Sequence, residues 1–276
     1  MNQNLQNSIS VNLASDGACI KRNFVEPHII TDLNSELDTY FSDPTVSTSF
    51  GVTPLDFSVR RLISPTRLSS VNVLELALSV FFTVIPKEQQ KDYLICEIQV
   101  NSEKSNPYPL NFHTDSCKKE IRAQIYLRGG EKYSGGFLYM CKTHLLDLGV
   151  KHHLESSLVE KFRETIVDYS GKPGDLVAFD AAGFHGKHVC LSERRTIMFT
   201  FYPRSSGPKE TLDMNTGCIS QIVLENIEFF VPNLESGLFR GWPKNFRNQP
   251  SSIQQSINFR LKLMAWSLFT KFKARR

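Results

Sequence analysis

The sequence of 276 residues lacks any two cysteines in a C-x-x-C arrangement. Its six cysteines are scattered along the chain: Cys19, Cys96, Cys117, Cys141, Cys190 and Cys218. Paired cysteines are typical of zinc sites, and dense cysteine frameworks are typical of small secreted domains. We therefore expect neither a structural zinc site nor a disulfide framework, and we expect a reducing, cytoplasmic location.

Long hydrophobic runs are also lacking. The first twenty residues are polar and contain no apolar segment of the kind found in secretory signals. The longest apolar stretch, residues 71–85, carries Glu75 and is shorter than the roughly 20 residues that cross a bilayer. Ser69 or Ser70 can cap a helix here and Pro86 can end it, so this stretch predicts a buried helix.

Basic and acidic residues nearly balance each other except at the C-terminus. The chain has 32 basic and 28 acidic residues, a net charge of +4. The tail has six basic residues and no acidic ones: Arg260, Lys262, Lys271, Lys273, Arg275 and Arg276. Apolar residues recur there at helical spacing: Ile253, Ile257, Leu261, Met264, Leu268 and Phe272.

This pattern predicts a basic amphipathic helix at the end of the chain. Such a helix can contact its own domain, a second subunit, another partner or an anionic membrane surface. Docking on its own domain or on a second subunit is favoured, because this is the commoner use of such a helix. Nucleic acid is not expected as a partner, because no recognised module or widespread basic patch accompanies the tail.

The rest of the chain divides into a helical part and a strand-rich part, without repeats or low-complexity tracts. Residues 24–43 and 69–85 predict two helices. Short segments rich in β-branched and aromatic residues predict strands over residues 93–100, 111–115, 121–127, 136–140, 176–180 and 196–202. This order favours a mainly β fold, a jelly-roll sandwich with flanking helices.

We therefore expect three parts. Residues 1–90 form an N-terminal helical segment that packs on the core, residues 91–205 form the core, and residues 206–276 form a C-terminal extension. Residues 143–172 are expected to be an insert that shapes access for substrate.

One short motif points to chemistry. In His113-Thr114-Asp115, an imidazole and a carboxylate two residues apart on a strand would point to the same side. A loop after residues 176–180 can bring His185 to the same point. Two histidines and one carboxylate on one face of a metal ion leave positions open for a cosubstrate and O2, the arrangement of non-haem Fe(II) oxygenases. His188 is the alternative to His185, but it stands only six residues before Arg194, whereas His185 stands nine before it.

The strand over residues 196–202 is preceded by two arginines, Arg194 and Arg195. Alternation places Arg194 with Thr196 and Thr200 on a polar face, and Arg195 with the apolar side chains between them. The planar guanidinium of an arginine can hold a carboxylate by two parallel hydrogen bonds. Alternation favours Arg194 as an anion-binding residue, with Arg195 as the alternative.

Polar residues share one face of another expected strand. Arg122, Gln124 and Tyr126 alternate with apolar residues over residues 121–127. A lined pocket or an exposed sheet face would both produce this pattern. Three further histidines are not expected to bind metal: His144 is interpreted as a supporting or structural residue, and His152 and His153 as part of a solvated loop.

From about residue 92 to residue 202 the chain resembles the Fe(II)/2-oxoglutarate-dependent dioxygenases, particularly the phytanoyl-CoA dioxygenase-like and prolyl-hydroxylase-like branches. The matching motifs are H-T-D at His113, I-R-A-Q-I-Y-L at Ile121, S-G-G-F-L-Y-M at Ser134, G-D-L-V-A-F-D at Gly174, F-H-G around His185 and R-R-T-I at Arg194. The resemblance implies a double-stranded β-helix core, cupin-like in form.

The same resemblance implies specific roles. His113, Asp115 and His185 would hold Fe(II), and Arg194 would bind the distal carboxylate of 2-oxoglutarate. Tyr126 would support the same carboxylate, and Gln124 on the same strand face is assigned to the cosubstrate site.

The implied activity is hydroxylation of an unactivated C–H bond in a small-molecule or conjugate substrate, with O2 consumed and 2-oxoglutarate converted to succinate and CO2. Two alternatives remain. A cupin-type metal-dependent hydrolase or isomerase would use the three ligands without 2-oxoglutarate, and a non-catalytic jelly-roll protein would only bind.

Overall fold

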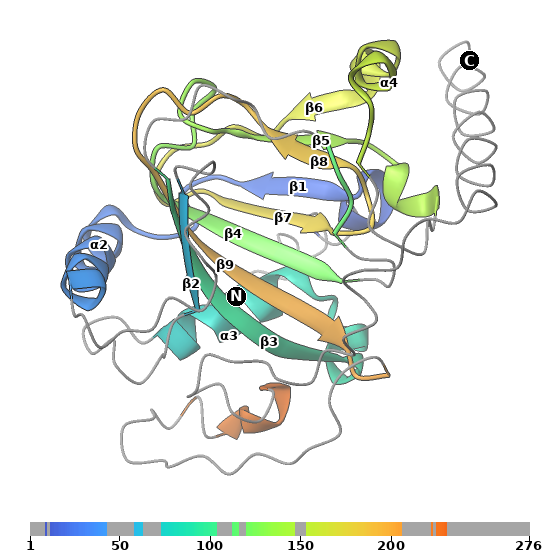
Figure 1. Cartoon of the computed structure of the whole chain (residues 1–276). Coiled ribbons are helices and arrows are strands. Elements are labelled where there is room, and N and C mark those ends of the chain that lie inside the picture. Colours follow the sequence, from blue (N-terminus) through green and yellow to red (C-terminus); the bar gives the residue numbers. More distant parts are fainter. Residues whose placement is uncertain are drawn as a thin grey trace.

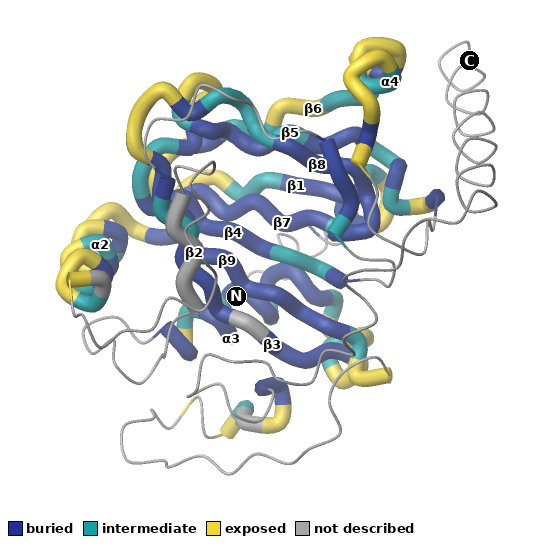
Figure 2. Tube along the Cα trace, viewed as in Figure 1, coloured by how far each residue is buried: buried dark blue, intermediate teal, exposed yellow. Residues whose placement is uncertain are grey.

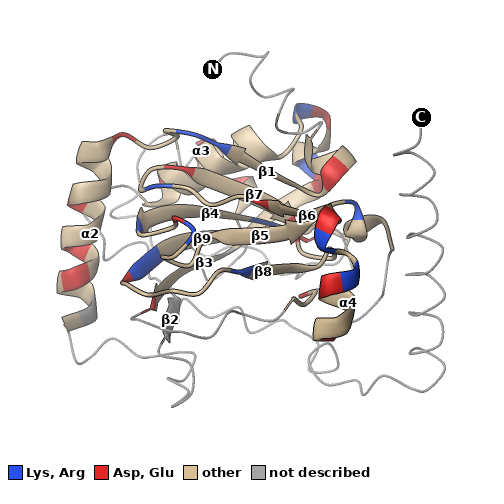
Figure 3. Ribbon diagram, turned by 90° about the horizontal axis from the view of Figure 1, so that it is seen from above, with Lys and Arg blue, Asp and Glu red and all other residues tan. Residues whose placement is uncertain are grey.

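The computed structural model describes residues 9, 12–42, 58–62, 73–103, 112–115, 120–146, 153–205, 222 and 225–230. Two antiparallel sheets face each other within this part of the chain (Figure 1). The larger sheet has the strand order β1-β7-β4-β9-β3-β2, and the smaller has the order β6-β5-β8. Seen from above, the strands of the two sheets run in roughly the same direction, with α2 at one edge (Figure 3).

The strands are β1 (Ala18–Lys21), β2 (Ser58–Leu62), β3 (Tyr93–Glu103), β4 (Ile121–Arg128), β5 (Phe137–Met140), β6 (Ile166–Asp168), β7 (Leu176–Asp180), β8 (His185–Lys187) and β9 (Arg194–Pro203). The α-helices are α2 (Pro27–Ser42), α3 (Val73–Val84) and α4 (Ser156–Lys161). Short 3-10 helices cover Lys87–Asp92, Thr143–Leu146, Arg163–Thr165 and Ile227–Phe229. None of the described helices is long and apolar enough to cross a bilayer.

The main hydrophobic core lies between the larger sheet and the helices α2 and α3. Strand alternation sends Ile197, Phe199 and Phe201 of β9 into this core. The helix α3 is apolar on nearly every side and contributes Val73, Leu74, Ala77, Leu78, Val80, Phe81 and Val84 to it. Each of these valine, leucine and phenylalanine side chains contributes about 1.5–3 kcal/mol when it is fully buried. This core holds the larger sheet in place, and β4, β7 and β9 are buried along most of their length (Figure 2).

The opposite faces of the strands meet in the space between the two sheets. Tyr126, Phe137, Tyr139, Val177 and Phe179 pack there as a second apolar cluster. A third cluster lies on the outer side of the smaller sheet, under α4, and contains Phe112, Met140, Leu146, Leu154, Phe162 and Phe184. The sandwich therefore has a helix-covered face and an interior between the sheets, and the polar faces of β4 and β9 line that interior.

The fold agrees with the expected jelly roll. Five of the six predicted strands are present as β3, β4, β5, β7 and β9, with ends that differ by a few residues. The prediction of a strand over residues 111–115 is wrong for the described residues 112–115. There His113 forms isolated bridges with His153 and His185, and the Asp115 N–H donates to the carbonyl of Ala181.

Strands β1 and β2 lie in the part of the chain that was expected to be helical. β1 pairs with β7, and β2 pairs with the far end of β3, so the larger sheet draws on residues before 91. The division of the chain into three parts stays a prediction. The expected C-terminal helix lies outside the described residues.

Candidate metal and cosubstrate site

Three potential metal ligands converge at one end of the interior. His113, Asp115 and His185 offer ligand atoms that all lie within 4.8 Å of one another. His113 Nε2 lies 3.3 Å from Asp115 Oδ1, and His185 Nε2 lies 3.1 Å from Asp115 Oδ2. The two histidines are brought together by backbone pairing, since each N–H donates to the other's carbonyl at 3.0 and 2.9 Å. The sequence motif and the more distant histidine thus meet without a strand at residue 113.

The orientation of His185 suits a metal ligand. Its Nδ1 lies 3.0 Å from the carbonyl oxygen of Gly183, which can accept a hydrogen bond from an Nδ1–H; in that tautomer Nε2 keeps its lone pair and can bind a metal. Phe137 and Phe179 pack against the ring, with centroids at 5.9 and 4.8 Å. Burial lowers the pKa of His185 although Asp115 opposes this shift. A neutral imidazole is the form that binds metal.

Asp115 is held by a chain of polar residues that the sequence did not reveal. Arg122 on β4 donates from Nη1 to Asp115 Oδ2 and from Nε to Oε1 of Glu120. Tyr202 on β9 donates to the other oxygen of Glu120, whose side chain is fully buried. Burial alone would raise the pKa of Asp115, but the charge of Arg122 and the polar contacts with His113 and His185 hold it well below its usual value. The carboxylate is therefore ionised and oriented before any metal binds.

Deeper in the sandwich, Arg194 and Arg195 point in opposite directions. Arg194 donates from Nη2 to Gln124 Oε1 at 3.2 Å, and its guanidinium carbon lies 5.9 Å from the ring centroid of Tyr126. Arg195 points outward to α2, where it lies 2.7 Å from Asp38. Alternation along β9 thus places Arg194 in the interior, on the face that its neighbours in the sequence indicated. Its role as a cosubstrate anchor stays a prediction.

Four buried polar atoms on this interior face have no hydrogen-bond partner within the described part of the chain. They are Gln124 Nε2, Arg194 Nε, Thr196 Oγ1 and Thr200 Oγ1. Leaving a buried donor unsatisfied costs about 1–3 kcal/mol, so such atoms call for an explanation. The two nitrogens can only donate and the two hydroxyls can donate. A ligand made of acceptors, such as a carboxylate, would satisfy them.

The donor sets therefore fit the two groups that the family resemblance implies. Two neutral imidazoles and one carboxylate match the preferences of Fe(II). A buried arginine among unsatisfied donors matches one end of a dicarboxylate such as 2-oxoglutarate.

Tyr126 differs from the expected arrangement. Its hydroxyl accepts a hydrogen bond from the Phe137 N–H at 3.1 Å and donates to the Tyr169 carbonyl at 3.4 Å. Burial raises the pKa of Tyr126 to about 12, so the hydroxyl stays protonated. The side chain presents its ring, not its hydroxyl, to Arg194. Support of a carboxylate by this hydroxyl would require its hydrogen to turn away from Tyr169, and the assignment stays a prediction.

Three other histidines, His188, His144 and His153, lie in different surroundings. His188 lies 2.9 Å from Asp168 near the surface and is not part of the triad. His144 packs against Gly17, with its Nε2 3.3 Å from the carbonyl of Ala14. His153 is exposed as expected, but its ring stacks on His113 with centroids 5.7 Å apart. It therefore lies beside the metal ligands, which the sequence did not indicate.

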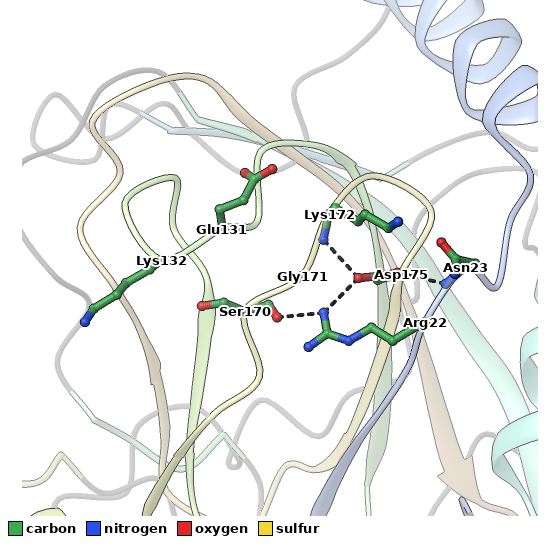
Figure 4. Close-up of a pocket in the computed structure, with 8 residues that line it drawn as sticks. All are labelled: Arg22, Asn23, Glu131, Lys132, Ser170, Gly171, Lys172 and Asp175. Carbon is green, nitrogen blue, oxygen red and sulfur yellow. Dashed lines mark hydrogen bonds and ion pairs between the residues drawn. The ribbon is translucent and has the colours of Figure 1, made fainter.

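A surface hollow of about 470 Å³ lies elsewhere (Figure 4). None of its lining residues belongs to the triad or to the group around Arg194 and Gln124. At its centre, Asp175 accepts hydrogen bonds from the backbone of Asn23 and Lys172 and from the side chain of Arg22. We interpret this hollow as the outer side of a tight turn, because the carboxylate of Asp175 already accepts hydrogen bonds from three residues of the protein.

Several solved structures with a similar fold contain 2-oxoglutarate or are named as dependent on it, whereas no protein-family model and no curated protein matches the sequence. HygX from Streptomyces hygroscopicus, solved with nickel, 2-oxoglutarate and hygromycin B, is 14% identical, with a TM-score of 0.54 over 74% of this chain and 88% of that one. The epimerase SnoN from nogalamycin biosynthesis, in complex with Fe3+, alpha ketoglutarate and nogalamycin RO, is 12% identical, with a TM-score of 0.57 over 73% and 85%. EctD from S. alaskensis, in its apoform, is 14% identical, with a TM-score of 0.56 over 76% and 81%.

At these identities the likeness establishes the fold. The chain shares the fold of these structures, and its two facing antiparallel sheets agree with the jelly roll that the resemblance implied.

Proposed function

We propose that this protein is a mononuclear non-haem Fe(II) enzyme that uses 2-oxoglutarate and O2 to hydroxylate an unactivated C–H bond of a small-molecule or conjugate substrate. One observation carries the proposal. A compact cluster of two histidines and an aspartate shares the sandwich interior with a buried arginine that is surrounded by unsatisfied donors. A hydrolase or a binding protein that used only the three metal ligands would not need Arg194 and the unsatisfied donors around it.

In this proposal His113, Asp115 and His185 hold the iron on one face, and the opposite side is left to the cosubstrate, O2 and the substrate. When bound, the iron and 2-oxoglutarate supply the oxidising chemistry, in which one atom of O2 enters the C–H bond and the other enters succinate as CO2 leaves. The protein's own residues orient these groups. The Nδ1–H of His185 is held by Gly183, and Arg122 keeps Asp115 turned toward the two imidazoles.

Arg194 and Gln124 are proposed to receive the distal carboxylate of 2-oxoglutarate. Thr196 lies on the same face of β9 and offers an unsatisfied hydroxyl to the same carboxylate. The aromatic side chains of Phe137 and Phe179 beside His185 exclude water from this part of the interior. A dry interior strengthens the ion pair between the guanidinium and the carboxylate.

Two solved structures of similar fold support this proposal, because HygX and SnoN were each solved with 2-oxoglutarate, a metal and an organic ligand. The epimerase name of SnoN shows that the fold also serves other outcomes. An experiment therefore has to identify the product as well as measure the consumption of 2-oxoglutarate.

The experiment is to load the protein with Fe(II) without oxygen, add 2-oxoglutarate and a panel of candidate substrates, and then admit O2. The proposal expects succinate and a product that is one oxygen atom heavier than the substrate. Asp115→Ala serves as the inactive control. Formation of succinate together with an isomeric or dehydrogenated product would support 2-oxoglutarate as the cosubstrate and rule out hydroxylation.

A further inference from the structure

A buried carboxylate joins cations from both sheets close to the proposed cosubstrate site. Glu103 is the last residue of β3 and lies directly opposite Arg194 in the ladder between β3 and β9. Its Oε1 is in hydrogen-bond contact with Nζ of Lys187 on β8, and its Oε2 lies 3.8 Å from Nη1 of Arg194. The side chains of Glu103 and Lys187 are 3% and 13% exposed. The three charges therefore sit in the interior, between the sheets.

The cluster contains more positive than negative charge. Among the described residues, Glu103 is the one carboxylate within ion-pair distance of either Arg194 or Lys187. Buried charges are stable only when they are paired, because their removal from water costs several kcal/mol for each ion. Two cations that share one carboxylate leave a surplus of one positive charge. A single further carboxylate would balance it.

Lys187 is also placed correctly for the length of a diacid. It stands two residues after His185 on the same short strand, so both side chains point into the interior. Two residues along a strand cover about 6.6 Å. This is comparable to the span of a five-carbon oxo diacid between its metal-binding end and its distal carboxylate.

We propose that Lys187 is a second cation for the distal carboxylate of 2-oxoglutarate, and that Glu103 limits the surplus to one charge so that the site selects a cosubstrate ending in one carboxylate. The proposal rests on the proposed function. It adds a binding residue from the smaller sheet, Lys187, and a positioning residue from the larger sheet, Glu103, to the site of Arg194. Glu103 itself does not touch the cosubstrate in this account, and it acts by orienting the two cations and setting their net charge.

The test compares two ligands that differ in one group. The protein is loaded with Mn(II) under anaerobic conditions and titrated by calorimetry with 2-oxoglutarate and with 2-oxopentanoate, which has the same carbon chain and no distal carboxylate. Lys187→Met should weaken 2-oxoglutarate binding by about tenfold, the equivalent of ~1.4 kcal/mol, and leave 2-oxopentanoate binding unchanged. Lys172→Met, which removes an exposed lysine, should change neither affinity. Equal weakening of both ligands by Lys187→Met would show a purely structural role and overturn the proposal.

Two more variants keep the test decisive if Lys187→Met does not fold. Lys187→Arg retains the charge and should retain the preference for 2-oxoglutarate over 2-oxopentanoate; loss of that preference would count against the proposal. Glu103→Gln raises the surplus to two charges, so inorganic phosphate should compete with 2-oxoglutarate about fivefold more strongly than in the parent, which corresponds to ~1 kcal/mol. Unchanged competition by phosphate would remove Glu103 from the account.

The outcome also separates this inference from the proposed function. If Arg194→Ala weakens 2-oxoglutarate binding and Lys187→Met does not, the proposed function stands and the inference fails. If neither substitution matters, both fail.

Discussion

The guanidinium of Arg122 lies 2.5 Å from Oδ2 of Asp115. This contact occupies one oxygen of the proposed ligand carboxylate and leaves Oδ1, 3.3 Å from His113 Nε2, on the side of the first histidine. Arg122 is itself fixed by Glu120, and Glu120 by Tyr202. We infer that these contacts would leave one oxygen of Asp115 available to a metal held by the triad.

Substitution of Arg122 tests this inference. Arg122→Met should weaken Fe(II) or Mn(II) binding by about tenfold, because partners that orient a metal ligand typically contribute 10–100-fold to affinity. The substitution also leaves Glu120 buried without its cation. Arg128→Met on the same strand is the matched control, since Arg128 pairs with Asp38 and Glu193 away from the triad. A metal affinity that rises in Arg122→Met would mean that the arginine acts mainly by repelling the cation.

Removal of the carboxylate ligand should abolish stoichiometric metal binding. Asp115→Ala is expected to stay folded but to lose bound iron after dialysis, as measured by elemental analysis and circular dichroism. Asp168→Ala removes a carboxylate that pairs with His188 and Ser170 near the surface, and it should keep its iron. Iron retention by Asp115→Ala at the level of the parent would place the metal site elsewhere.

The turn anchored by Asp175 should contribute stability that depends on pH. Burial alone would raise the pKa of Asp175, but the N–H groups of Asn23 and Lys172, together with Arg22, hold it below its usual value. A buried hydrogen bond to a charged group contributes about 1.5–3 kcal/mol. We therefore expect Asp175→Asn to lower the free energy of unfolding by at least about 1.5 kcal/mol at neutral pH, measured by chemical denaturation.

The sign of the pH dependence follows from the lowered pKa. The unfolded state binds a proton at about pH 3.9 and the folded state only at lower pH, so the contribution of Asp175 is fully present above about pH 5, begins to fall near the unfolded pKa and is lost as pH falls through the folded pKa. The difference in unfolding free energy between parent and Asp175→Asn should therefore shrink between about pH 5 and about pH 3. A difference that stays constant over this range would contradict the account. Metal binding at neutral pH should be unaffected.

The orientation of side chains was predictable from the sequence where a strand is long enough to show several repeats of alternation. The two faces of β4 and β9 follow directly from their polar and apolar residues, and this alternation separated Arg194 from Arg195. The shortest strands were not predictable. β1 and β8 contain four and three residues, too few to show a pattern, and they are strands because they pair with β7 and β5.

Contacts between side chains that are distant in the sequence were also beyond a linear reading. Glu103 and Lys187 meet only because the two sheets pack face to face. His153 lies beside His113 because a backbone bridge joins their segments. His153 was expected to lie on a solvated loop, and in both cases tertiary packing determined the outcome.

The binding of 2-oxoglutarate to the metal-loaded protein tests the central claim most directly. Arg194 points into the interior and Arg195 points to Asp38, so one substitution should matter and its neighbour should not. In calorimetric titrations of the anaerobic Mn(II) forms, Arg194→Ala should weaken 2-oxoglutarate binding by at least about tenfold, or ~1.4 kcal/mol, with metal still bound. Arg195→Ala should bind 2-oxoglutarate like the parent. Equal binding by the parent and both variants would contradict the assignment of 2-oxoglutarate as cosubstrate.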